Sequence, residues 1–70
     1  MSTRTAADLH DHLELLQQER ALALGTALAD DAAYMADLEE EILATRHAYV
    51  GSVVVEIARL RATVSGALRG

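Results

Sequence analysis

Two apolar seams run along one long predicted helix in the second half of this chain, and they restrict its fold more than any other feature. The first seam consists of Ile42, Tyr49, Val53, Ile57, Leu60, Val64 and Ala67. The second is made mostly of small residues, spaced alternately four and three apart: Ala44, Ala48, Gly51, Val55, Ala58, Ala62 and Ser65. That spacing is the heptad pattern of helices that pack side by side. Because a surface helix needs only one apolar stripe, we expect further copies of the chain to cover the second.

The composition favours an all-α protein that is stabilised by association. The chain has 70 residues and no proline, and most of its apolar content is Ala, Leu and Val. Ala and Leu are strong helix formers. A single domain of this size, residues 1–70, gains only about 3–5 kcal/mol from its own core. Because there is no cysteine, neither a disulfide nor a thiolate metal site can add to that stability, and oligomerisation remains.

The first helix is expected over about residues 5–25. Thr3 or Thr5 can serve as its N-cap, since a threonine hydroxyl accepts a hydrogen bond from an amide of the first turn. Its apolar face repeats every three or four residues and consists of Leu9, Leu13, Leu16, Ala23 and Ala27. Arg20 falls inside this stripe. Either its apolar stem lies along the seam, or its guanidinium pairs with an acid of another copy.

A turn within residues 25–31 is expected to divide the chain into an antiparallel helical hairpin. Gly25 can end the first helix, and Asp30 or Asp31 can cap the second, which is expected over about residues 31–68. A connection of two to five residues joins antiparallel helices. The alternative is one unbroken helix, because an interior glycine costs only about 1 kcal/mol.

The second helix is expected to project beyond the first, which is only about two-thirds as long, and the projecting part carries both seams. Within it Val53, Val54 and Val55 point in three directions around the helix. β-branched residues have low helix propensity, so we infer that these three valines occur here because they pack against more than one neighbouring helix. We expect the first seam to be buried in a hairpin or dimer core and the second to be buried by a different helix.

One cluster has the residue types of a metal site: Asp8, His10, Asp11, His12 and Glu14. On a helix its i,i+4 pairs point in different directions, and no third ligand is evident. The Glu-x-x-His pattern of di-iron bundles is missing, since Ala44 stands three residues before His47. The sequence has no nucleophile elbow and no phosphate-binding glycine pattern. We therefore expect no catalytic residue, no metal and no cofactor, and we interpret His47 as a residue flanking an interface.

Charge is distributed unevenly along the chain. The net charge is −5, which disfavours binding to nucleic acid or to an anionic membrane. Residues 30–41 contain six acidic side chains and no basic one, whereas four of the five charges after residue 41 are arginines. The acidic run Glu39–Glu41 is either a solvated surface near the helix start or a docking surface for the arginine-rich end of another copy. The second reading favours antiparallel pairing.

These observations predict a non-enzymatic, self-associating helical protein. The alternative is a small helical-hairpin regulator that binds nucleic acid or another protein, and the crowded second seam also fits a natural oligomer whose second interface was redesigned. The longest apolar stretch, residues 48–55, is far shorter than the roughly 20 residues of a membrane span. With no apolar segment after Arg4 to form a signal peptide, we expect a cytoplasmic protein with no membrane partner.

Overall fold

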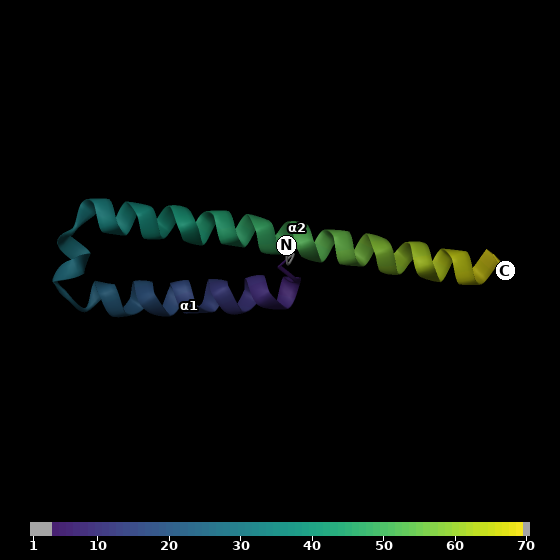
Figure 1. Cartoon of the computed structure of the whole chain (residues 1–70), viewed down its shortest axis with the longest axis horizontal. Helices are drawn as coiled ribbons and strands as arrows, with labels where there is room; N and C mark the ends of the chain where they lie inside the picture. The colour runs from purple at the N-terminus through teal and green to yellow at the C-terminus, as the bar shows by residue number, and fades with distance from the viewer. Residues whose placement is uncertain (1–3, 70) are drawn as a thin grey trace.

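The chain forms two antiparallel helices of unequal length, joined by a short turn (Figure 1). The computed structural model describes residues 4–69, with side chains described as far as residue 66. Helix α1 spans Ala6–Leu24, the 3-10 turn η1 spans Ala27–Asp30, and α2 spans Ala32–Arg69. The predicted all-α class, with a short and a long helix, is confirmed. The expectations for Thr3, Ala67 and the side chain of Arg69 lie outside the described residues.

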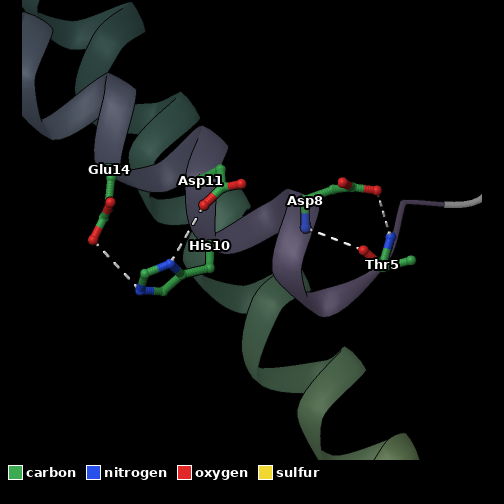
Figure 2. Close-up of polar contacts among 5 residues, drawn as sticks. All are labelled: Thr5, Asp8, His10, Asp11 and Glu14. Atoms are coloured by element: carbon green, nitrogen blue, oxygen red, sulfur yellow. Dashed lines mark hydrogen bonds and ion pairs between the residues drawn. The ribbon is translucent and has the colours of Figure 1, made fainter.

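Helix α1 begins with a capping box (Figure 2). The amide of Asp8 donates to Oγ1 of Thr5 at 3.1 Å, and the amide of Thr5 donates to Oδ2 of Asp8 at 3.2 Å. Both contacts satisfy backbone amides that have no partner within the helix, and the Asp8 carboxylate lies at the positive end of the helix dipole. Of the two threonines expected as N-cap, Thr5 takes that role.

The turn between the helices is held by backbone and side-chain caps, so the described chain is not one unbroken helix. The amide of Gly25 donates to the carbonyl of Leu22 at 3.1 Å, which ends α1. Gly25 has φ −90°, a conformation open to any residue, so its role here does not depend on the left-handed region. Oδ1 of Asp31 then accepts from the amide of Tyr34 at 3.0 Å and caps the start of α2.

The core lies between the two helices and is formed by one stripe from each. Leu13 and Leu16 of α1 pack with Leu38 and Ile42 of α2, and Tyr34 covers this cluster at the turn end. Buried positions further along α1 are Ala6, Leu9 and Ala23. These residues recur every three or four positions, which places them on one side of each helix and removes their side chains from water.

Thr45 is a buried polar residue that our sequence analysis did not place in the core. It is 7% exposed, and together with Leu38, Ile42 and Tyr49 it continues the steps of four and three that face α1. The first seam leaves a gap between Ile42 and Tyr49, and Thr45 fills it. A search restricted to apolar residues misses such a position, although its heptad spacing identifies it.

Polar side chains join the helices along both edges of this core. Nε of Arg20 donates to Oε1 of Glu39, Nε2 of His12 lies 3.3 Å from Oε1 of Glu41, and Tyr34 Oη donates to Glu19 Oε2 at 3.1 Å. Arg20 therefore pairs with an acid of its own chain, which differs from both alternatives expected for it. Partial burial, followed by the hydrogen bond and the negative charge of Glu19, raises the pKa of Tyr34 above its ordinary 10.0.

Helix α2 continues far beyond the start of α1, as Figure 1 shows, and the molecule measures 62 × 20 × 16 Å. Ala6 and His10 of α1 border a hollow with Tyr49, Val53 and Glu56 of α2, which marks where the paired part of α2 ends. No helix within residues 4–69 is both long enough and apolar enough to cross a bilayer.

Candidate association surface

The part of α2 that projects beyond α1 has no partner in the chain and is rich in apolar side chains. Every residue from 54 to 66 is exposed. Large apolar side chains in this segment are Val54, Val55, Ile57, Leu60 and Val64. Leu60 is 65% exposed and Val54 is 59% exposed. We call residues 54–66 the overhang.

The first seam divides into two parts near the start of α1. Ile42 is in the hairpin core, and Tyr49 and Val53 are half-buried near the start of α1. Ile57, Leu60 and Val64 continue along α2 beyond the start of α1, and all three are exposed. Burial of these three residues within the hairpin, one of the two outcomes we expected, does not occur in the single chain. Burial by another copy remains a prediction.

The second seam is exposed along its described length. Its members are exposed at every position: Ala44, Ala48, Gly51, Val55, Ala58, Ala62 and Ser65. Gly51 comes two residues after Tyr49, and Ala44 comes two residues after Ile42; both of these earlier side chains lie against α1. Because two residues turn a helix by about 200°, the second seam lies on the side of α2 that faces away from α1. A Cβ built on Gly51 meets no atom within 4 Å. Nothing inside this chain therefore requires glycine at position 51.

Two further exposed apolar residues, Leu43 and Val50, were not part of either seam. Leu43 is 51% exposed and Val50 is 53% exposed. Together with Ile57 and Val64 they recur every seven residues, with Val54 in between. A spacing of seven keeps side chains on one side of a helix, so this regularity could have found them from the sequence. The apolar surface of α2 is thus broader than the two seams.

Charged residues border the second seam at both of its ends. Glu40 and Glu41 lie near its beginning, and Arg59 and Arg61 lie near its end, all of them exposed. Among the described side chains, Glu40, Arg59 and Arg61 form no ion pair within the chain, whereas Glu41 contacts His12. His47, which we expected to flank an interface, is exposed.

The predicted metal-like cluster separates into three unrelated arrangements. Asp8 belongs to the capping box, and His12 turns toward Glu41 on the other helix. The remaining three side chains gather on the surface of α1, as Figure 2 shows: Nε2 of His10 lies 3.6 Å from Oε1 of Glu14, and Nδ1 lies 3.9 Å from Oδ1 of Asp11. The His10 ring also packs at 5.5 Å between centroids against Tyr49. These exposed contacts are those of ordinary surface ion pairs.

The hollows of the hairpin are shallow grooves along its edges. One groove, between the helices, is lined by Gln17, Arg20, Glu39, Ile42, Leu43 and Arg46. Glu40 also lines this groove, and of its four charged residues Arg20 and Glu39 pair with each other. No family model, no curated protein and no solved structure matches the chain.

Proposed function

We propose that this chain is a non-enzymatic self-association module, and that the exposed apolar side of α2 is its binding surface. The observation that carries the proposal is the overhang, in which five large apolar side chains are exposed with no partner in the chain. Soluble monomers rarely expose contiguous apolar patches of this kind, and such patches commonly mark interaction sites. Removing them from water is the main driving force for protein association.

The hairpin by itself provides little stabilisation, which supports association as its main property. Seven apolar residues form the described core: Ala6, Leu9, Leu13, Leu16, Ala23, Leu38 and Ile42. None of the described side chains is large and fully buried. Two-helix units with so small a core are usually stabilised by a partner. The module that we propose gains its stability from the same contacts by which it assembles.

The decisive measurement is the mass of the chain in solution as a function of concentration, by analytical ultracentrifugation and native mass spectrometry. We expect an oligomer that dissociates on dilution with loss of helicity. The double substitution Val54→Asp with Val55→Asp should reduce the mass, because it introduces charges into an apolar contact. A wild-type chain that stays monomeric at every concentration would refute the proposal.

The matched control is Leu15→Asp, which makes the same kind of change at an exposed apolar residue of α1. Leu15 is 63% exposed and lies on the other helix, away from the overhang. We expect this variant to keep the wild-type mass. Equal dissociation by Leu15→Asp and by the α2 variant would show that association does not depend on the surface of α2.

A further inference from the structure

We infer that the partner on the second seam is α2 of a second copy, which packs antiparallel about a two-fold axis between residues 49 and 50. This inference rests on the proposed self-association and specifies its geometry. The seam is free for such contact because α1 covers the opposite side of α2. Among the described residues, Arg4, Thr5 and Ala6 border a hollow at one edge of the seam, together with Gly51 and Val55.

Charge complementarity selects the antiparallel direction and the register. With the axis between residues 49 and 50, the acids Glu40 and Glu41 of one copy lie beside Arg59 and Arg61 of the other. The two-fold axis repeats the arrangement at the other end of the contact, as in any symmetric dimer. A parallel pair would instead bring the arginine-bearing ends of both helices to one level and the acidic ends to another, which gathers like charges at each end of the contact.

The charges also lie on the correct edges of the seam. At 100° per residue, Glu40 and Arg61 lie on one edge of the seam, and Glu41 and Arg59 lie on the opposite edge, so each edge brings an acid of one copy to an arginine of the other. Within one chain Glu40 and Arg61 are about 30 Å apart along the helix, too far to interact. Neither has an ion-pair partner among the described side chains of its own chain.

The central residues of the seam fit this register without crowding. Ala48 lies against Gly51 of the other copy, and Ala44 lies against Val55. Side chains this small let two helix backbones approach closely, and Gly51, which nothing inside the chain requires, lies beside the axis. In this arrangement the outer side of each overhang runs along the first half of α2 of the other copy, so part of it leaves the solvent.

A charge-swap experiment tests the pairing. Arg61→Glu alone should weaken the dimer by at least about fivefold in Kd, because it places a carboxylate beside Glu40 of the other copy. The double substitution Glu40→Arg with Arg61→Glu should restore the wild-type Kd, since it rebuilds the pair with reversed signs. The matched control is Glu56→Arg with Arg61→Glu, which keeps the net charge but leaves Glu40 facing a carboxylate, and it should remain weak.

A distance measurement tests the direction independently. Because the chain has no cysteine, His47→Cys and Ser65→Cys each introduce one site for a nitroxide label. In the antiparallel dimer the two labels at position 47 lie within about 20 Å of each other, whereas those at position 65 are separated by about 45 Å along the helices. In a parallel dimer both distances are short.

The outcomes distinguish this inference from the proposed function. A wild-type chain that is monomeric at all concentrations refutes both. A dimer with short distances at both positions, or with no rescue by the charge-swapped double variant, refutes the antiparallel seam contact and leaves self-association established. Rescue together with a short distance at position 47 and a long one at position 65 supports the inference.

Discussion

Nε2 of His12 lies 3.3 Å from Oε1 of Glu41, although the two residues are 29 positions apart in the chain. The contact shows that the first half of α1 lies beside Glu41 of α2. The His12 ring therefore points toward α2, away from the surface contacts that His10 makes with Asp11 and Glu14. Residues that look like one cluster in the sequence therefore serve different purposes, and the hairpin explains each of them.

The His12–Glu41 contact should contribute little to stability. The His12 side chain is 30% exposed and that of Glu41 is 55% exposed, so water screens the pair. We expect His12→Ala to lower the free energy of unfolding by less than about 1 kcal/mol. Chemical denaturation followed by far-UV circular dichroism measures this change. A loss as large as that of a core leucine would mean that this contact, and not the apolar stripe, holds the helices together.

Truncating a core leucine should have a much larger effect than truncating an exposed one on the same helix. Leu13 is 9% exposed and packs in the core, whereas Leu15 is 63% exposed. We expect Leu13→Ala to destabilise the hairpin by about 2–4 kcal/mol and Leu15→Ala to change it by less than about 0.5 kcal/mol. Denaturation of both variants at the same protein concentration tests this, and similar losses at the two positions would contradict the described core.

The helices could be predicted because local signals agree with the tertiary contacts. The Thr5 hydroxyl, the apolar repeat of Leu9, Leu13 and Leu16, and the cap at Asp31 each act within a few residues. Such signals can be recognised in a sequence because the spacing of residues along a helix determines which side chains lie on the same face of that helix. The start of α1 determines how much of α2 is left uncovered, and the expected overhang followed from comparing the two helix lengths.

Partner choice was harder to predict than helix position. Arg20 could have paired with any acid within reach, and only the packed hairpin shows that Glu39 is beside it. Thr45 is buried because of its position and despite its hydroxyl group. Leu43 and Val50 were missed because they interleave with two other apolar lines on the same helix. On a helix that is apolar on several sides, periodicity alone does not say which side meets which neighbour.

The capping box should contribute measurably to the stability of α1. Thr5 Oγ1 accepts from the amide of Asp8, and Thr5→Ala leaves that amide without a side-chain partner. We expect a loss of about 1 kcal/mol, the usual cost of removing an N-cap. Thr63→Ala is the matched control, since Thr63 is exposed in the overhang and its hydroxyl donates to the carbonyl of Arg59 within α2. Equal effects of the two substitutions on thermal unfolding would show that the cap is not specifically stabilising.

Ala58→Glu should separate association from folding of the hairpin. Ala58 is exposed and lies beyond the start of α1, so among the described residues there is room for the larger side chain. In the antiparallel pair it would lie beside Glu41 of the other copy, and we expect a weaker dimer whose helices still form at high concentration. Ala21→Glu, the same substitution at an exposed alanine of α1, is the control and should keep the wild-type mass. An unchanged mass for Ala58→Glu would show that the second seam faces solvent.

Tyr34 should make the hairpin less stable at alkaline pH. Partial burial and the neighbouring Glu19 carboxylate raise its pKa in the folded chain above 10.0. The folded state therefore binds the phenolic proton more tightly than the unfolded state does. This contribution is fully present below pH 10 and is lost as the pH rises through the higher folded pKa. Ultraviolet titration in a Tyr49→Phe background reports Tyr34 alone. In that background Glu19→Gln should lower the midpoint toward 10, because it removes the charge that Tyr34 Oη faces at 3.1 Å. A midpoint that does not respond to Glu19→Gln would show that the carboxylate does not influence this tyrosine.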